Sequence, residues 1–458
     1  MRVRFAPNPS GDLHIGTAHT AFFNWLYARH EGGVFVLRIE DTDPETAKPE
    51  LVDPIMESLR WLGINWDEGP DIGGSFGPYR DSERRTNHEE TVEQLLSAGA
   101  AYRCWCTREQ LEARGVKAGY DRHCRMLSDA DRATRSAEPA AIRFAVPDGR
   151  DVVVDDLVMG EVKFEYADLQ DRVIVRSDGS PLYLLAVTSD DVAMEITHVL
   201  RGADLLPSTP LQILITEALG ADLPTFAHLP LLLGENKGKL SKRKGSDGVL
   251  SFRERGFLPE ALVNFLALLG WSSPTQEEKL SVEQIIREFT IDRVIEHPAV
   301  FDTTKLSWLN QQYIIELDDA DLVRRVVELD PSVPVDVVQP MAELIKTRVT
   351  TLAEVPDAIR YIHERPKLET SKWLGTDEAN NTLEAVAEEL GSLEPWTAQA
   401  IGEAIQKVIA DLGLNRRKGT KPIFVAISGS EVSLPLYESI ELIGRSEAVA
   451  RLRAASSG

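Results

Sequence analysis

The sequence predicts an α/β domain with a parallel sheet, interrupted by an insertion and followed by a largely helical region. Three observations predict this architecture. Residues 1–39 show the patterns of a strand, a helix and a strand in turn. A similar alternation of strand and helix patterns returns at 183–255, after an irregular stretch. Beyond residue 256 almost every signal is helical. Apolar periodicity carries each of these assignments.

The first element is a short apolar strand at residues 3–5. A turn at 7–11 follows, in which two prolines and a glycine disfavour regular structure. From about Thr17 apolar side chains recur at helical spacing, glycines at 32–33 end the helix, and 34–39 is a nearly continuous apolar run. Such a run suits a parallel strand buried on both faces. We therefore expect a βαβ unit whose ligands lie beyond the carboxyl ends of its strands.

The chain between the two α/β segments differs in character. It holds all three cysteines, a polar stretch and several short strand-like runs. We interpret it as an insertion between two halves of one α/β domain, the second of which carries a helix at 209–220 and a buried strand at 228–234. The domains expected from the sequence are 1–85, 86–182, 183–255, 256–310 and 311–458, the last two helical.

Composition excludes several classes of protein. The 458 residues are 43% hydrophobic and 27% charged, which excludes a mainly disordered chain. No apolar run approaches the ~18 residues of a membrane span, and no signal peptide is expected. With only three cysteines a disulfide framework is not expected, and the reducing cytoplasm is the expected location. The net charge of −23 argues against non-specific coating of nucleic acid but is compatible with a local basic groove.

The segment between the first strand and the first helix suits an anion. His14 and Gly16 fall where the helix begins, and a helix N-terminus presents unpaired N–H groups to anions. Gly16 lacks a side chain, so a base or ribose could lie against the backbone, and His14 could donate to a phosphate oxygen. A capped turn with an incidental histidine is the alternative.

A second segment, ENKGKLSKRKGSDG, carries a dense positive charge. Its cations are Lys237, Lys239, Lys242, Arg243 and Lys244, with no acid between them. Polyphosphate is the natural counter-ion of such a cluster. A solvated basic loop is the alternative, and it is the commoner outcome for a charge run considered alone.

Together these segments resemble the paired signatures of class I aminoacyl-tRNA synthetases. HIGT at 14–17 is similar to their HIGH motif, and KLSKR at 239–243 is similar to KMSKS. RFAPNPSGDLHIG, LRIEDTD, DEGPDIGGSFGPYRDSER and ITHVLRGADLLPSTPLQIL narrow the resemblance to the bacterial glutamyl-tRNA synthetase family, over the whole chain. The resemblance implies a Rossmann-type catalytic domain in two halves, an inserted α+β acceptor-binding domain, a stem-contact domain at 256–310 and an all-helical anticodon-binding region.

The resemblance implies an enzyme that activates L-glutamate with ATP and transfers it to the terminal adenosine of tRNA(Glu). Mg²⁺ accompanies ATP, and glutamyl-adenylate is the intermediate. Such chemistry depends on positioning and charge stabilisation more than on an acid–base pair. The implied ATP contacts are His14, Gly16, Asp204, Lys239 and Lys242, all but Asp204 also catalytic. We expect a monomer without membrane association.

The resemblance also implies a glutamate pocket. Arg4 matches the arginine that pairs with the substrate side-chain carboxylate, and an arginine fork suits that task. Glu40 matches the residue that holds the α-amino group, and Asn8, Tyr183 and Arg201 match further pocket positions. An edge-strand charge at Arg4 and a solvated strand end at Glu40 are the alternatives.

One further position matches the family, and two positions depart from it. Asp43 corresponds to a position near the tRNA end. Asn8 replaces the usual serine of the pocket, and Ala203 replaces a usual glutamate, so that position lacks a carboxylate. Asn8 still offers hydrogen bonds, so we expect a modest retuning of the pocket.

The three cysteines predict a metal site. Cys104, Cys106 and Cys124 lie close together in the sequence, and thiolates at this spacing suit tetrahedral Zn²⁺ with a fourth ligand. The pattern resembles the zinc site in the insertion of some family members, which makes Tyr120 the fourth ligand, whereas His123 is chemically the more ordinary donor. Such a zinc would be structural. Reduced buried thiols without metal are the alternative.

The segment LIKTRVTTL resembles the family's anticodon region. Arg348 falls where an arginine is associated with accepting glutamate anticodons and refusing glutamine ones. Arginine reads single-stranded bases by hydrogen bonding and stacking, although an exposed helix arginine is the alternative. Tryptophans 308, 373 and 396 are expected in the core.

The leading hypothesis is a cytoplasmic glutamyl-tRNA synthetase. One alternative is a non-discriminating enzyme that also charges tRNA(Gln), against which Arg348 counts. Another, from a different class, is a non-catalytic tRNA-binding paralogue. A paralogue would be expected to have degraded signature motifs, whereas His14, Gly16, Lys239 and Lys242 are all present.

Overall fold

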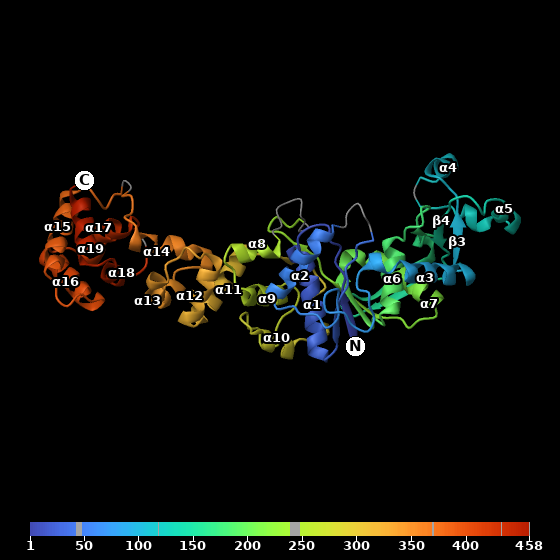
Figure 1. The fold of residues 1–458 in the computed structure, drawn as a ribbon, viewed down its shortest axis with the longest axis horizontal. Helices are drawn as coiled ribbons and strands as arrows, with labels where there is room; N and C mark the ends of the chain where they lie inside the picture. The colour runs from blue at the N-terminus through green and yellow to red at the C-terminus, as the bar shows by residue number, and fades with distance from the viewer. Residues whose placement is uncertain (43–47, 118, 239–247, 369–370, 432, 458) are drawn as a thin grey trace. The chain divides into compact units, whose positions relative to one another are not determined.

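The computed structural model describes residues 1–42, 48–117, 119–238, 248–368, 371–431 and 433–457. The chain divides into two compact units (Figure 1). Unit 1 comprises Met1–Ser251 and Leu262–Asp302, and unit 2 comprises Phe252–Ala261 and Thr303–Gly458. None of the helices in the described ranges is long and apolar enough to cross a lipid bilayer.

Unit 1 begins with the βαβ arrangement that the sequence predicts. Strands β1 (Arg2–Phe5) and β2 (Val34–Leu37) pair in parallel, and helix α1 (Ile15–Glu31) connects them. The helix ends at Gly32, whose φ of 63° is a conformation that glycine adopts without a steric penalty. Most side chains of both strands are buried, as expected of a parallel sheet covered on both faces.

A four-stranded sheet lies beside this pair, in the order β6-β5-β9-β8. Strands β5 (Val152–Asp156) and β8 (His198–Gly202) flank β9 (Thr225–Leu229) and run parallel to it, whereas β6 (Gly160–Phe164) is antiparallel to β5. The N–H of Thr197 donates to the carbonyl of Arg2 over 3.1 Å, which places β8 next to β1. Strands from the segment expected as an insertion therefore share a sheet with the α/β core.

The strand expected at 228–234 is divided. Strand β9 ends at Leu229, and β10 (Leu232–Leu233) pairs instead with β11 (Ala299–Val300) in a separate two-stranded sheet. Pro230 lies at the break, and proline has no N–H to donate to a neighbouring strand.

The remaining elements of unit 1 surround these sheets. Strands β3 (Ala101–Cys104), β4 (Ala141–Phe144) and β7 (Val173–Val175) form an antiparallel sheet. The helices expected near 209–220 and after 256 are present as α7 (Thr209–Ala218) and α9 (Pro259–Leu268). The helices are α2 (Val52–Trp61), α3 (Arg85–Ser97), α4 (Arg108–Ala113), α5 (Asp129–Thr134), α6 (Tyr183–Ala193), α7 (Thr209–Ala218) and α10 (Val282–Glu288), with α8 (Val249–Glu254) and α9 (Pro259–Leu268) crossing into unit 2.

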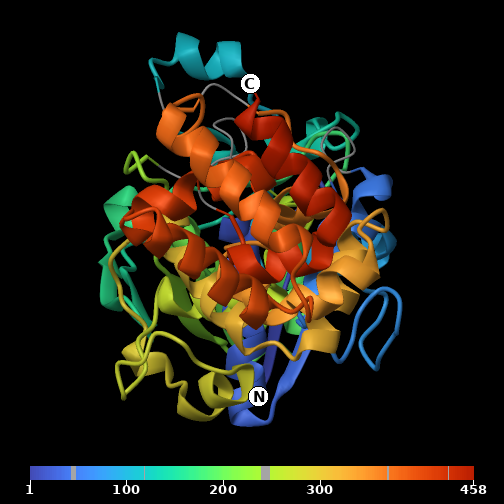
Figure 2. The ribbon, with the colours of Figure 1, turned by 90° about the vertical axis from the view of Figure 1, so that its left-hand side faces the viewer.

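Unit 2 is helical throughout the residues that the structure describes. Buried aliphatic side chains from most of its helices form one continuous core. Helix α15 (Asp377–Gly391) packs along α19 (Arg445–Ser456) and α16 (Ala398–Asp411), which are drawn in orange to red in Figure 2. Trp308 is 43% exposed, so the prediction that it is a core residue is wrong. The helices are α11 (Thr303–Glu316), α12 (Asp319–Leu329), α13 (Val335–Lys346), α14 (Val355–His363), α15 (Asp377–Gly391), α16 (Ala398–Asp411), α17 (Arg416–Ser428), α18 (Leu436–Ile443) and α19 (Arg445–Ser456).

Candidate active site

A cavity of about 400 Å³ lies in unit 1, where the carboxyl ends of β1 and β8 meet the start of α1. It brings together every described residue that was predicted to contact ATP or glutamate. Those residues are Arg4, Asn8, His14, Gly16, Glu40, Tyr183, Arg201 and Asp204. Lys239, Lys242 and Asp43 lie outside the described residues.

His14 caps the N-terminus of α1. Its Nδ1 accepts hydrogen bonds from the backbone N–H groups of Gly16 at 3.1 Å and Thr17 at 3.4 Å. The proton of the neutral imidazole therefore lies on Nε2, which is 2.8 Å from the hydroxyl oxygen of Thr17. The histidine thus satisfies the first N–H groups of the helix from one side of the cavity.

Gly16 permits this arrangement because it has no side chain. A Cβ at Gly16 would lie 3.1 Å from Cε1 of His14 and 3.3 Å from its Nδ1, closer than most such contacts in proteins. The glycine therefore lets the imidazole lie against the first turn of α1. The same bare backbone faces the cavity.

Arg4 is held by a carboxylate from a distant part of the chain. Its Nε donates to both oxygens of Asp191, at 3.0 and 3.2 Å, and the residue is only 4% exposed. Among the described residues, neither terminal nitrogen of Arg4 has a hydrogen-bond acceptor within range. The guanidinium is therefore oriented through Nε while its terminal nitrogens remain available to a ligand in the cavity.

Arg38 forms a second layer beneath Arg4. It is fully buried, donates from Nη1 to Asp191 at 2.8 Å, and makes ion pairs with Asp81 at 3.6 Å and Glu40 at 3.5 Å. Burial lowers the pKa of Arg38, but the surrounding carboxylates, Asp191 foremost, raise it by more. Arg38 therefore stays charged and links Glu40, in the segment after β2, to Asp191 in α6.

Glu40 is one of two acidic residues that line the cavity, the other being Asp204. Burial raises its pKa from an ordinary 4.5 to about 7, against the opposing charges of Arg38 and Arg4. The cationic group of a ligand bound beside this carboxyl would favour its ionised form. Asp190 behaves in the opposite way: burial raises its pKa, but the hydrogen bond from His88 and the charges of Arg38 and Arg84 lower it to about 2.

Arg201 enters the cavity from β8. Its Nε donates to Nε2 of His228 over 3.1 Å, and its Nη2 donates to the hydroxyl of Thr209 over 2.8 Å. Nη1 is buried and has no partner among the described residues. Burial lowers the pKa of Arg201. A carboxylate in the cavity would satisfy the remaining nitrogen.

Tyr183, Asn8 and Asp204 complete the lining. Tyr183 is the first residue of α6, and its side chain is 39% exposed. Partial burial raises the pKa of its hydroxyl. Asn8 lies in the turn after β1, and Asp204 follows β8. The lining therefore has anion-binding arginines, an acidic group and a helix N-terminus around one space, which suits a small acid bearing an ammonium group beside a nucleotide phosphate.

The sequence reasoning missed the charged residues behind the lining. Asp190 and Asp191 are adjacent acids in α6, a helix that is otherwise largely apolar, and Arg38 interrupts the apolar run at 34–39. A charged residue inside an apolar segment is rarely buried without a partner, so the sequence could have predicted buried ion pairs at these positions. His228, which follows two apolar residues in β9, carried the same signal.

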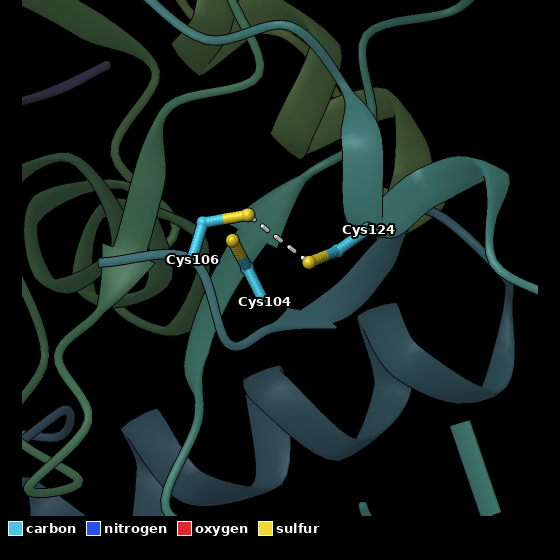
Figure 3. A group of neighbouring side chains, drawn as sticks. All are labelled: Cys104, Cys106 and Cys124. Atoms are coloured by element: carbon cyan, nitrogen blue, oxygen red, sulfur yellow. Dashed lines mark hydrogen bonds between the residues drawn. The ribbon is translucent and has the colours of Figure 1, made fainter. Parts of the chain in front are cut away.

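The three cysteines converge in a small cluster (Figure 3). Their sulfur atoms lie within 4.8 Å of one another, with 3.4 Å between Cys106 and Cys124. Within the described ranges no other set of three or more histidine, cysteine or acidic residues comes together in this way. Converging thiols suit Zn²⁺, which binds cysteine sulfur at about 2.3 Å.

Tyr120 lies against this cluster, whereas His123 does not. The hydroxyl oxygen of Tyr120 is 3.3 Å from the sulfur of Cys104 and 3.8 Å from that of Cys106, and it accepts the backbone N–H of Cys124 at 2.8 Å. His123 is exposed and is not part of the sulfur group.

Positive charge surrounds the sulfurs. Arg143 donates to Cys104 and Arg114 donates to Cys106, each over 3.2 Å. The pKa of Cys104 is lowered to about 4, chiefly by the hydrogen bond from Cys124, with Tyr120 and Arg143 also contributing. That same hydrogen bond raises the pKa of Cys124. The arginines and these hydrogen bonds favour the thiolate form of Cys104, the form that binds metals.

Arg348 lies in unit 2, just after the end of α13. Its side chain is exposed, and its N–H donates to the carbonyl of Ile345 over 2.8 Å. Arg416, Arg417 and Lys418 form the exposed first turn of α17.

Comparisons with known proteins agree over the whole chain. Residues 1–308 match the model of the catalytic domain of class I tRNA synthetases (E and Q), and residues 306–456 match an anticodon binding domain. The fold is thus a class I catalytic domain of sheet and helix, followed by a mostly helical anticodon-binding domain.

Curated relatives of this chain are described as glutamate–tRNA ligases. A glutamate–tRNA ligase of Carboxydothermus hydrogenoformans is 43% identical over 99% of both chains, and one of Mycobacterium tuberculosis is 42% identical over 99% of this chain and 97% of its own. The crystal structure of a glutamate tRNA ligase from Elizabethkingia meningosepticum, in complex with its amino acid, has a TM-score of 0.91 at 34% identity and covers 100% of this chain and 99% of that one. This chain therefore belongs to the glutamate–tRNA ligase family of class I aminoacyl-tRNA synthetases.

Proposed function

We propose that this chain joins L-glutamate to tRNA(Glu) in two ATP-dependent steps, both at the cavity of unit 1. One observation carries this proposal: a single space is lined by arginines, an acidic group and the N-terminus of α1. Glutamate has two carboxylates and one ammonium group, and therefore complements this lining.

Glutamate would be held by charge on opposite sides of the cavity. Arg4 and Arg201 each offer at least one nitrogen that has no hydrogen-bond acceptor among the described residues, and they would take the carboxylates. Glu40 would take the ammonium group, with Asn8 and Tyr183 supplying further contacts. The ion pairs of Arg4 and Arg38 with Asp191 are made before substrate arrives, so the pocket is preorganised.

ATP would lie along the N-terminus of α1. The α-carboxylate of glutamate attacks the α-phosphate, and pyrophosphate leaves. His14 would donate from Nε2 to a phosphate oxygen, Gly16 would admit the nucleotide to the backbone, and Asp204 would contact it from the segment that follows β8. Lys239 and Lys242 are assigned to the polyphosphate by their sequence motif alone.

Mg²⁺ supplies charge neutralisation when it is bound to the phosphates. The described residues offer no acidic cluster that would cage it, so we propose that it enters with ATP.

The tRNA would contact several further segments. We assign residues 86–182 to the acceptor end, with a structural Zn²⁺ held by Cys104, Cys106, Cys124 and Tyr120. Asp43 is assigned to the tRNA end near the pocket and Arg348 to the anticodon, with residues 256–310 at the stem. A monomer would suffice, because one chain supplies every residue proposed for the pocket.

Aminoacylation with labelled glutamate tests this proposal. The assay is run separately on purified tRNA(Glu) and tRNA(Gln), with ATP and Mg²⁺. Charging of tRNA(Glu) alone is the expected result. Charging of both would make the enzyme non-discriminating, and charging of neither would favour a non-catalytic tRNA-binding paralogue.

A further inference from the structure

The guanidinium of Arg201 is fixed along one edge. Nε and Nη2 form that edge, and they donate to His228 and Thr209 respectively, so only Nη1 is left for a ligand. The direction of Nη1 therefore depends on groups that never touch the ligand. His228 is the first of these, and it is completely buried.

A carboxylate behind His228 sets the tautomer of its ring. Nδ1 of His228 is 2.5 Å from Oδ2 of Asp156, and an ionised carboxylate only accepts hydrogen bonds. The proton must therefore lie on Nδ1, which leaves the lone pair of Nε2 to accept from Arg201 over 3.1 Å. The hydroxyl of Thr209 lies at the same 3.1 Å from Nε2.

The backbone holds Asp156 in place. Its Oδ1 accepts the N–H groups of His228 at 3.1 Å, Val158 at 3.0 Å and Met159 at 2.9 Å. Burial raises the pKa of Asp156, but these bonds and that of the His228 ring lower it below its ordinary value. The carboxylate is thus ionised near neutral pH and has little freedom to turn.

We propose that Asp156 and His228 are positioning residues, which hold Arg201 so that its free nitrogen meets a carboxylate of the amino-acid substrate. The proposal rests on the proposed function, because it takes the ligand to be glutamate. Asp156 comes from β5, within the segment expected as an insertion, so that segment supplies part of the support of the glutamate pocket.

The opposite tautomer would break this chain of hydrogen bonds. An amide at position 156 can donate to Nδ1, which moves the imidazole proton to Nε2. Two donors, Nε2–H of His228 and Nε–H of Arg201, would then face each other, and the guanidinium would have to turn away. In metal sites, mutation of a group that orients a ligating side chain typically costs about 10- to 100-fold in affinity or activity, and we expect an effect of this order here.

Asp156→Asn tests this directly, and Asp155→Asn is its matched control. Asp155 is the preceding residue of the same strand but is exposed. We expect Asp156→Asn to raise the KM for glutamate about tenfold or more, with the KM for ATP changed less than about twofold. Asp155→Asn should match the wild type in both. A fall in kcat and melting temperature of Asp156→Asn without a change in glutamate KM would indicate a purely structural role and overturn the proposal.

His228 provides a second test if Asp156→Asn folds poorly. Glutamine places an acceptor oxygen near the position of Nε2, whereas leucine has none. We expect His228→Gln to keep the KM for glutamate within a few-fold of the wild type and His228→Leu to raise it as Asp156→Asn does. Equal glutamate KM values in the two variants would overturn the proposal.

Nitrogen-15 NMR of the wild-type imidazole separates this inference from the proposed function. We expect the His228 proton on Nδ1 in wild type and on Nε2 in Asp156→Asn. A proton on Nε2 of His228 in the wild type would contradict the proposed hydrogen-bond chain from Asp156 through His228 to Arg201, whichever tRNA the enzyme aminoacylates. Failure of the wild type to charge tRNA with glutamate, with the proton on Nδ1, contradicts the proposed function instead.

Discussion

Nε of Arg4 lies 3.0 Å from Oδ1 of Asp191, although the two residues are 187 positions apart in the chain. The pairing joins β1 to α6 behind the candidate active site. It leaves the terminal nitrogens of Arg4 available to a substrate, because only Nε is engaged among the described contacts. The orientation of Arg4 is therefore set by a carboxylate that does not line the cavity.

Asp191→Asn should weaken the binding of glutamate more than that of ATP. The amide keeps the volume of the carboxylate but removes the charge that both Arg4 and Arg38 contact. We expect the KM for glutamate to rise about tenfold and the KM for ATP to change little, as measured by steady-state aminoacylation. Arg4→Ala should raise the glutamate KM at least as much.

Asp178→Asn is the control for this substitution. Asp178 is exposed and bonds only to the neighbouring Ser180 among its described contacts. Its kinetics should equal those of the wild type. A glutamate KM that is unchanged in both Asp191→Asn and Arg4→Ala would remove this pair from the pocket.

Local elements were predictable because their signals are local. The apolar run before Glu40, the glycines after α1 and the helical spacing of α7 predict structures that are present. The end of β9 was misplaced, because pairing of Leu232 and Leu233 with residues near 300 is a long-range event that periodicity does not contain.

The site was predictable only in its lining. His14, Arg4 and Glu40 stand in motifs, whereas Asp191 and Asp156 lie behind the cavity lining and contact residues that are distant in the sequence. Their roles follow from burial next to a partner, the guanidinium of Arg4 for Asp191 and the imidazole of His228 for Asp156, which only the folded chain reveals. Three close cysteines, by contrast, predict their own convergence, because their spacing is short.

Glutamate binding should weaken as the pH falls below neutrality. The pKa of Glu40 is raised by burial to about 7, so the free enzyme loses this carboxylate progressively as pH falls through that value. The neutral acid cannot pair with an ammonium group. We expect the apparent KM for glutamate to rise up to about tenfold per pH unit below that point, whereas the KM for ATP should rise less.

Glu40→Gln supplies the comparison for the pH profile. The amide cannot ionise, so the variant should have a high KM for glutamate already at pH 8. This KM should change little between pH 8 and pH 6. A wild-type profile equally flat over this range would show that Glu40 does not hold the ammonium group.

Lys242→Ala should slow formation of glutamyl-adenylate without unfolding the protein. A lysine that neutralises charge on a departing pyrophosphate acts mainly in the transition state, so its loss is expected to lower the rate about 100-fold or more. Pyrophosphate exchange in the presence of tRNA measures this step, and the melting temperature monitors the fold. Lys237→Ala, earlier in the same basic run, should have a much smaller effect; equal rates in the two variants would argue against a specific role for Lys242.

Arg348→Ala should relax the choice of tRNA. The side chain is exposed at the end of α13, so its loss should leave the melting temperature unchanged. We expect the ratio of kcat/KM for tRNA(Glu) over tRNA(Gln) to fall several-fold, because one base-reading contact contributes about 1–3 kcal/mol. Arg360→Ala, at an exposed position of α14, is the control. A ratio that is the same in both variants would assign Arg348 to the solvated surface.

Metal analysis of the purified chain should find about one zinc per molecule. Cys104→Ser combined with Cys106→Ser should bind none, because two of the three sulfurs within 4.8 Å are then lost. Chelation should lower the melting temperature, since metal binding stabilises a folded site that does not exist in the unfolded chain. A zinc-free wild type, purified without chelator, would leave the cysteines as buried thiols.

The fourth ligand is decided by a pair of substitutions. Tyr120→Phe removes the hydroxyl that lies 3.3 Å from the sulfur of Cys104 and 3.8 Å from that of Cys106, whereas His123→Ala removes an exposed ring outside the sulfur group. We expect Tyr120→Phe to weaken zinc affinity by about 10-fold or more and His123→Ala to leave it unchanged, as measured by competition with a chromophoric chelator. A zinc affinity weakened by His123→Ala and unchanged in Tyr120→Phe would make His123 the fourth ligand. The turn at His123–Met126 would then have to rearrange when metal binds.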